Sequence, residues 1–223
     1  WLAGPPPGEW RKARLSESWE NRLFTEILVP LSGEPESWAA LDQALGIARQ
    51  EGAQLRGMHS APGESASQED ARRIQTEFER RCQEAGVGAS FSITVGQVAR
   101  QVCEKARWTD LVVLNLAHPP GRGALARLGS GIRTILRRCS RPVLCVPGSP
   151  SPLRHGLLAF DGSPKAREAL YLAAYLAAQW RIALTVTHVT ETPDGPNLPL
   201  VEALAYLENA GIEANPAALS SPR

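Results

Sequence analysis

The chain has 223 residues, of which 43% are hydrophobic and 21% charged, and its formal net charge at pH 7 is +1. This length suits one large or two small globular domains, and the near-neutral charge argues against a dedicated nucleic-acid-binding protein. No apolar run is long enough to span a bilayer, so membrane insertion is not expected.

The first 24 residues have the composition of a linker or an arm. They hold a Gly-Pro-Pro-Pro tract and then a charged stretch with Trp10 and Trp19. These tryptophans are suited to docking on a neighbouring domain or on a partner outside the chain. Because the chain opens with Trp1 rather than Met, we expect a fragment, or a chain whose first residues are absent, such as the cytosolic part of a larger protein.

From residue 25 onward, predicted strands alternate with predicted helices. Short strands rich in leucine and β-branched residues are predicted at 27–31, 54–59, 89–95, 110–114 and 142–146. Helices with one apolar face are predicted at 37–50, 68–85, 97–107 and 131–138. This alternation predicts parallel βαβ units and an α/β fold, with a doubly wound five-stranded parallel sheet over residues 25–147.

A shorter run of the same pattern follows a predicted linker at residues 148–154. The segment 27–59 recurs without a gap 129 positions later, at 156–188. Ten residues are identical between the segments: Leu28, Gly33, Pro35, Ala40, Leu41, Ala44, Ala48, Gln50, Leu55 and His59 match Leu157, Gly162, Pro164, Ala169, Leu170, Ala173, Ala177, Gln179, Leu184 and His188. We therefore expect residues 155–223 to form a second copy, truncated at its C-terminal end.

The ligand crevice of an open parallel sheet lies at the carboxyl ends of the strands, where the strand order reverses. Two segments should meet there: the turn Leu31-Ser32-Gly33 after the first strand, and the loop 115–130 after the fourth. Gly121, Gly123, Gly129 and Gly131 in and after that loop allow the backbone to approach a ligand closely.

The same loop has the charge of an anion site. Ser130 stands at the predicted start of a helix, where free N–H groups and the helix dipole favour an anion. Arg122 and Arg127 are placed to clamp a phosphate, and no Asp or Glu occurs from Leu111 through Phe160.

The sequence resembles the universal stress protein family. The matching stretches are Ile27-Leu-Val-Pro-Leu-Ser-Gly33, Asp110-Leu-Val-Val-Leu114 and the long run from Leu128 to Val146. The resemblance covers residues 25–147 completely and about 155–215 in part. It implies an adenine-nucleotide-binding type of α/β fold, a cytoplasmic location, and homodimers or tandem copies paired like a dimer. Some members bind ATP and others do not.

The sequence departs from the ATP-binding pattern of that family, which is Gly-x2-Gly-x9-Gly-Ser/Thr after the fourth strand. Gly129 and Ser130 match the final pair, but Leu116 and Pro119, or in the other alignment Asn115 and His118, stand where the two earlier glycines belong. ATP-binding members also carry an Asp after the first strand. The first copy has Ser32 there, whereas the second has Asp161, followed by Gly162.

The resemblance thus implies a degenerate nucleotide site, with no catalytic and no metal-ligating residue assigned. Its candidate residues are Leu31 and Met58 beside the base, with Ser32, Gly121, Arg122, Gly123, Arg127, Gly129, Ser130 and Gly131 around the phosphates. Gly33 and Asn115 are further nucleotide-binding candidates, and Asp161 and Gly162 are a second-copy remnant.

Three functions stay open. The first is a non-enzymatic regulatory module in the stress response, which acts through contacts with an unknown protein partner. The second is a true binder of ATP with Mg²⁺, at most a slow ATPase. The third, a nucleotidyl-transfer enzyme, lacks its histidine-rich signature. We also expect self-association, through the open edge of the second copy or through the strand 142–146.

Overall fold

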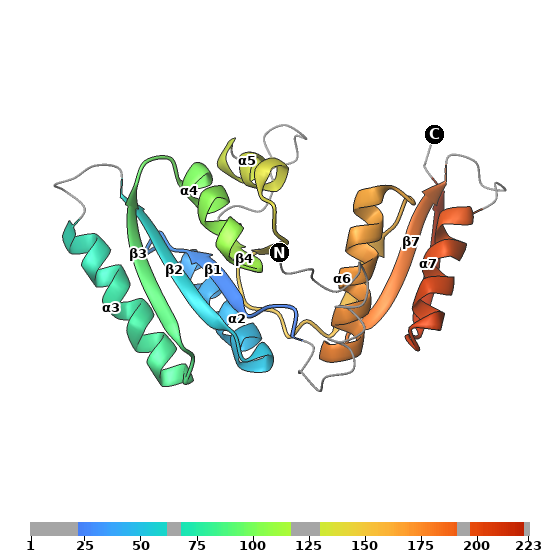
Figure 1. Ribbon diagram of the computed structural model, residues 1–223, viewed down its shortest axis with the longest axis horizontal. Coiled ribbons are helices and arrows are strands. Elements are labelled where there is room, and N and C mark those ends of the chain that lie inside the picture. Colours follow the sequence, from blue (N-terminus) through green and yellow to red (C-terminus); the bar gives the residue numbers. More distant parts are fainter. Residues whose placement is uncertain (1–21, 62–67, 117–129, 191–196, 221–223) are drawn as a thin grey trace, which may run out of the picture. The chain divides into compact units, whose positions relative to one another are not determined.

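The computed structural model describes residues 22–61, 68–116, 130–190 and 197–220 (Figure 1). The chain folds as two compact units that divide between Ser151 and Pro152.

Unit 1 alternates strands and helices along the chain. Its elements are β1 (Glu26–Pro30), α2 (Pro35–Glu51), β2 (Gln54–Ala61), α3 (Gln68–Ala85), β3 (Ala89–Val95), α4 (Val98–Lys105), the 3₁₀ helix η1 (Ala106–Trp108), β4 (Leu111–Asn115), α5 (Ser130–Arg138) and β5 (Val143–Val146). The five strands form one parallel sheet in the order β3-β2-β1-β4-β5. The predicted α/β fold with a five-stranded parallel sheet is confirmed.

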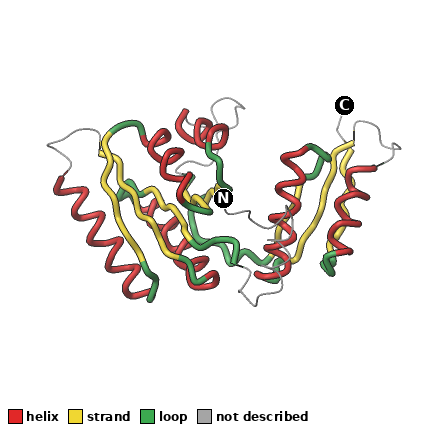
Figure 2. Tube along the Cα trace, in the orientation of Figure 1, coloured by secondary structure: helices red, strands yellow, loops and turns green. Residues whose placement is uncertain are grey.

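The two faces of this sheet are covered by different helices, which Figures 1 and 2 show as separate layers. On one face Leu28 and Val112 pack with Val102 of α4 and Ile135 of α5 in a buried cluster. Alternate residues of a strand point to opposite faces, so Ile27 and Val29 point to the α2 side. Both are fully buried, as expected for a parallel sheet with two covered faces.

Helix α3 packs on β2 and β3 through an apolar stripe. Ile74, Phe78 and Cys82 are at most 2% exposed, and the Phe78 and Phe91 ring centroids are 5.2 Å apart. Burial raises the pKa of the Cys82 thiol to about 11, with a smaller contribution from the nearby Glu79 carboxylate. Cys82 is therefore a protonated core thiol at neutral pH.

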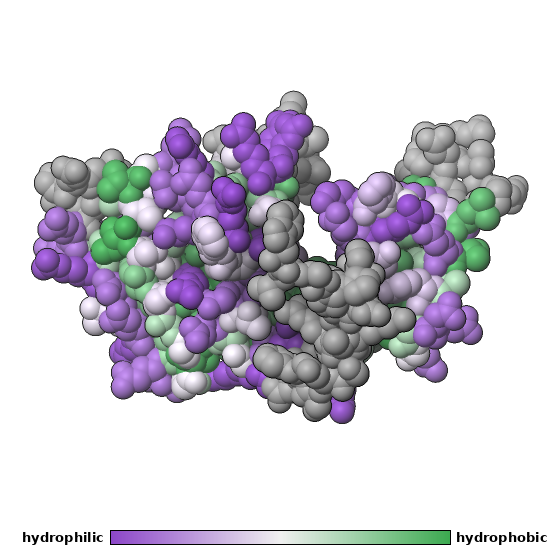
Figure 3. Space-filling view, in the orientation of Figure 1, coloured by the Kyte–Doolittle hydropathy of each residue, from purple (hydrophilic) through white to green (hydrophobic). Residues whose placement is uncertain are grey.

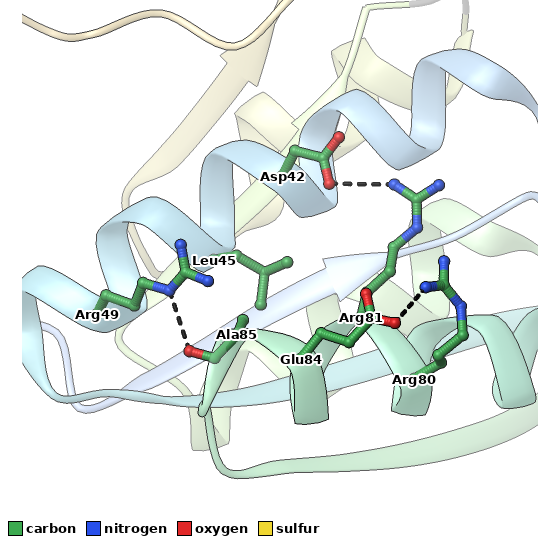
Figure 4. A pocket seen from close by; sticks show the side chains of 7 residues that line it. All are labelled: Asp42, Leu45, Arg49, Arg80, Arg81, Glu84 and Ala85. Carbon is green, nitrogen blue, oxygen red and sulfur yellow. Dashed lines mark hydrogen bonds and ion pairs between the residues drawn. The ribbon is translucent and has the colours of Figure 1, made fainter.

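An ion pair and a hydrogen bond join α2 to α3, as Figure 4 shows. Arg81 pairs with Asp42 at 3.1 Å and lies 4.9 Å from the centre of the Trp38 ring, and Arg80 pairs with Glu84. Arg49 donates to the carbonyl oxygen of Ala85 at 3.0 Å. Each of these arginines therefore has a protein partner, and together the side chains line a shallow hollow.

The start of β1 is tied to the start of β4 by one carboxylate. Oδ2 of Asp110 accepts hydrogen bonds from the Thr25 hydroxyl at 2.8 Å and from the backbone N–H groups of Thr25 and Glu26, both at 3.0 Å. These contacts set the amino ends of the two strands side by side. Their carboxyl ends therefore also meet, and this is where the candidate site lies.

Unit 2 contains a smaller parallel sheet. Its elements are β6 (His155–Ala159), α6 (Pro164–Trp180), β7 (Ala183–Thr190), α7 (Leu198–Asn209) and β8 (Ala214–Ser220), with the strand order β6-β7-β8. Leu158, Phe160, Leu170, Val186 and Leu207 form its buried core. The bounds of β6, α6 and β7 equal those of β1, α2 and β2 shifted by 129 positions, whereas α7 has 12 residues against 18 in α3.

Candidate functional site

The strand order of the sheet in unit 1 reverses next to β1, which makes this the topological switch point of the fold. The chain passes from β1 to β2 and β3 on one side and then returns to β4 on the other, as the strand order shows. The carboxyl ends of β1 and β4 therefore border the position where doubly wound folds bind their ligands. The candidate site is built from the residues that follow these two strands.

Leu31, directly after β1, is fixed by two hydrogen bonds to the end of β2. Its N–H donates to the Met58 carbonyl oxygen at 2.8 Å, and its own carbonyl oxygen lies 2.9 Å from Nδ1 of His59. Leu31 is 3% exposed and Met58 is fully buried, where it packs with Leu28 and Val112. Both predicted base contacts are thus part of the hydrophobic core in this structure, and their role in binding stays a prediction.

The next two residues form a tight, pre-shaped turn. Ser32 is exposed, and its hydroxyl oxygen accepts the N–H of Glu34 at 3.3 Å. Gly33 adopts φ +90°, and a Cβ there would lie 3.0 Å from the side chain of Ile74. The Gly33 carbonyl oxygen accepts the Trp38 indole N–H at 3.1 Å. The turn therefore requires glycine at position 33 and holds Ser32 at the rim of the site.

The phosphate side of the site is described in part. Asn115 ends β4, is half-buried and pairs with Val146 of β5. The predicted contacts Gly121, Arg122, Gly123, Arg127 and Gly129 lie outside the described residues. Ser130 begins α5, as expected for a residue at a helix N-terminus, and Gly131 is exposed in its first turn.

A groove of about 840 Å³ runs between α4 and α5 from that helix start. Arg100, Arg107 and Arg138 line it, with Glu104 as its acidic residue. Glu104 accepts a hydrogen bond from Arg100 at 3.0 Å, so the lining keeps a net positive charge. Figure 3 shows hydrophilic residues gathered over α5. Sequence reasoning missed Arg100 of α4 and Arg107 of η1, because their proximity to α5 depends on helix packing.

In unit 2 the turn after β6 is closed by a carboxylate, where the turn after β1 in unit 1 has the Ser32 hydroxyl. Oδ1 of Asp161 accepts the N–H of Ser163 at 2.9 Å, as Ser32 does for Glu34, and Gly162 adopts φ +78°. Hydrogen bonds from the side chain and backbone of Ser163 hold the pKa of Asp161 below its usual value, and His188 adds a smaller electrostatic effect. The exposed Asp161 therefore stays ionised at neutral pH.

Neither a cluster of potential metal ligands nor a membrane-spanning helix occurs among the described residues. Among those residues no group of three or more His, Cys, Asp and Glu side chains is arranged to hold a metal ion. Within the same ranges no helix has the length and apolar character that crossing a membrane requires.

Comparison with known proteins decides the family. The model of the universal stress protein family matches residues 24–147, which are more than half of the chain and include all of the sheet of unit 1. The chain belongs to the universal stress protein family. No curated protein sequence matched the chain.

Solved structures of universal stress proteins share this fold at low sequence identity. One from Archaeoglobus fulgidus DSM 4304 is 18% identical, with a TM-score of 0.73 over 88% of this chain and 77% of that one. Another from Pseudomonas aeruginosa UCBPP-PA14, described as a putative member, is 18% identical, with a TM-score of 0.65 over 90% and 76%. A third, solved in complex with cAMP, is 23% identical, with a TM-score of 0.50 over 57% and 99%.

Proposed function

We propose that this universal stress protein is a non-enzymatic regulatory module of the cytoplasm that acts through protein contacts and whose nucleotide site is degenerate. The observation that carries the proposal is the turn after β1. Position 32 holds a serine, and its hydroxyl oxygen already accepts the N–H of Glu34. No acidic side chain stands at that position to bind the ribose or to hold a metal.

The base end of the site supports the same proposal. Leu31 and Met58 are buried against neighbouring core side chains, and the Leu31 carbonyl oxygen already accepts a hydrogen bond from His59. A nucleobase would have to displace close-packed side chains to enter there, which is unfavourable in a dense interior.

Unit 2 is, under this proposal, a second and shorter copy of unit 1. The constant shift of 129 positions through β7 supports this, as does the repeated contact of His188 Nδ1 with the Phe160 carbonyl oxygen at 2.8 Å. The two copies, or two chains, would then present strand edges for protein contacts. At one such edge, β3, Ile93 and Val95 are 47% and 58% exposed.

Nucleotide binding is the second candidate function, and a separate observation favours it. The N-terminus of α5 opens beside a basic groove, which suits a phosphate, and one structural neighbour was solved with cAMP. In this case the chain would bind ATP with Mg²⁺ through Ser130, Gly131 and the preceding loop.

Isothermal titration with ATP and Mg²⁺, and separately with cAMP, tests the two candidates. The proposed regulatory module gives no binding heat up to about 5 mM nucleotide. Micromolar binding that is lost in the Gly129→Ala, Ser130→Ala double variant would overturn the degenerate-site proposal and establish nucleotide binding. Ser151→Ala, which changes a serine outside the loop, is the matched control and should leave any binding unchanged.

A further inference from the structure

A small hollow lies on the α4 side of the sheet, away from the carboxyl-edge turn. It has a volume of about 290 Å³ and is lined by residues of β2, β3, α4 and η1, among them Arg56, Ser90, Ser92, Lys105 and Trp108. Arg56 is paired with Ser90 early in the β2–β3 ladder, whereas Ala61 and Val95 form its carboxyl end. The hollow is therefore a different place from the candidate site at the carboxyl ends of the strands.

Trp108 exposes an unusually large apolar surface at this hollow. It is 83% exposed, although its neighbours Ala106 and Thr109 are 0% and 3% exposed. These buried neighbours anchor the backbone of η1, so the fold keeps Trp108 at the rim of this hollow. An exposed indole on a fixed backbone offers a flat surface on which an aromatic ring can stack.

The charge of the hollow comes to about one positive unit. Arg56 donates through Nε and Nη2 to the carboxylate of Glu26 at 2.7 and 2.9 Å, so this ion pair is close to neutral. Lys105 makes no ion pair with any residue that the structure describes. A singly charged carboxylate fits this balance better than a doubly charged phosphate.

The two serines differ in what they can offer a ligand. The Ser90 oxygen accepts a hydrogen bond from Nη1 of Arg56 at 3.3 Å, which leaves its hydroxyl proton to donate. Ser92 instead donates to the Gly57 carbonyl oxygen at 3.4 Å, so toward a ligand it is an acceptor. One donor hydroxyl beside one ammonium group matches the two oxygens of a carboxylate.

We propose that this hollow is a second ligand site, which binds a small aromatic carboxylate. The ring stacks on Trp108 and the carboxylate lies between Lys105 and Ser90. The volume of about 290 Å³ lies just below the range for small-molecule sites, about 300–1,000 Å³, which favours a ligand of one or two rings. The proposal goes beyond the proposed function and does not depend on it.

Equilibrium dialysis of the full chain with 2-naphthoate tests this site. We expect a submillimolar dissociation constant that rises at least about tenfold in Trp108→Ala and in Lys105→Gln. The uncharged 2-naphthamide should bind at least about fivefold more weakly and be insensitive to Lys105→Gln. Tyr206→Ala and Lys165→Gln, which change an exposed aromatic ring and an exposed lysine of unit 2, should leave naphthoate binding unchanged.

Three results would overturn the proposal. The first is no naphthoate binding up to about 5 mM, and the second is binding that neither Trp108→Ala nor Lys105→Gln weakens. The third is displacement of naphthoate by ATP together with loss of naphthoate binding in Ser130→Ala, since these results would place the ligand at the carboxyl ends of the strands. Because both substituted side chains lie at the surface of the hollow, unchanged thermal unfolding should confirm that the variants fold.

Discussion

His59, near the end of β2, braces Leu31, which directly follows β1: its Nδ1 lies 2.9 Å from the Leu31 carbonyl oxygen, and both residues are buried. His188 makes the same contact with Phe160 at 2.8 Å, again 28 residues apart in the chain. A histidine side chain thus takes the place of a backbone donor just beyond the ladder. It fixes the point at which the chain leaves the strand and enters the turn.

Replacing this brace should destabilise unit 1. In His59→Ala the buried Leu31 carbonyl oxygen loses its partner, which costs about 1–3 kcal/mol of unfolding free energy. Urea unfolding followed by circular dichroism measures the loss. His188→Ala, where the histidine is half-buried, should cost less because water can reach the freed carbonyl. Equal or reversed effects would contradict the bracing role.

Gly33 and Gly46 should respond oppositely to the same substitution. Gly33→Ala places a Cβ at φ +90° and 3.0 Å from Ile74, so we expect a loss of roughly 1–3 kcal/mol. Gly46 lies inside α2 with no atom within 4 Å of an added Cβ, so Gly46→Ala should stabilise the fold by about 0.5–1 kcal/mol. Thermal unfolding of both variants checks the signs, and a neutral Gly33→Ala would refute the strained-turn argument.

The Glu77 carboxylate should make stability depend on pH in the acid range. Hydrogen bonds from Arg80 and then Arg81 lower its pKa from the ordinary value of 4.5 to about 2. The stabilisation is therefore complete above pH 4.5 and is lost as the pH falls from 4.5 toward 2.

Glu77→Gln isolates this contribution. We expect a loss of about 0.5–1 kcal/mol at neutral pH that shrinks as the pH falls below 4.5, measured by urea unfolding across the pH series. Glu79→Gln removes a carboxylate that accepts from the Gln75 amide rather than from an arginine, and serves as the control. A difference between wild type and Glu77→Gln that is constant from pH 7 to pH 2 would contradict the assignment.

Strand β5 should mediate self-association through its open edge. Its only neighbour among the described strands is β4, and the carbonyl oxygens of Pro142 and Val146 point to β4. By alternation, the N–H of Cys145 points to the open side, so Cys145→Pro removes an edge donor without breaking the ladder. Sedimentation over a dilution series should show a dimer for the wild type and a shift toward monomer for this variant. A wild type that is monomeric throughout would refute the prediction.

Much of unit 1 could be predicted because its local signals are strong. The predicted helix at 68–85 and strand at 89–95 coincide with α3 and β3, since α3 carries a clear apolar stripe and charged residues elsewhere. The helix predicted from residue 37 begins at Pro35, because proline is suited to the first turn of a helix. The helix predicted at 97–107 tightens after Lys105 into the 3₁₀ turn η1.

Contacts between distant residues could not be predicted in this way. The Asp110 carboxylate accepts a hydrogen bond from the Thr25 backbone 85 positions earlier, and no local sequence pattern predicts such a contact. The hollow at Trp108 joins β2, β3 and α4, so it exists only once the sheet is assembled. For the candidate site, the sequence indicated the turn at Ser32 and the helix start at Ser130, whereas the burial of Met58 depends on packing.

The buried, protonated thiol of Cys82 can be used to measure how often the native structure opens around it. A thiol with a pKa near 11 and 2% exposure reacts with alkylating reagents only after α3 has left the sheet. The rate of Cys82 labelling under native conditions therefore reports how often this thiol is exposed, by detachment of α3 or by global unfolding. Because α3 covers β2 and β3, the labelling rate of Cys82 measures how often this part of the sheet becomes accessible to solvent.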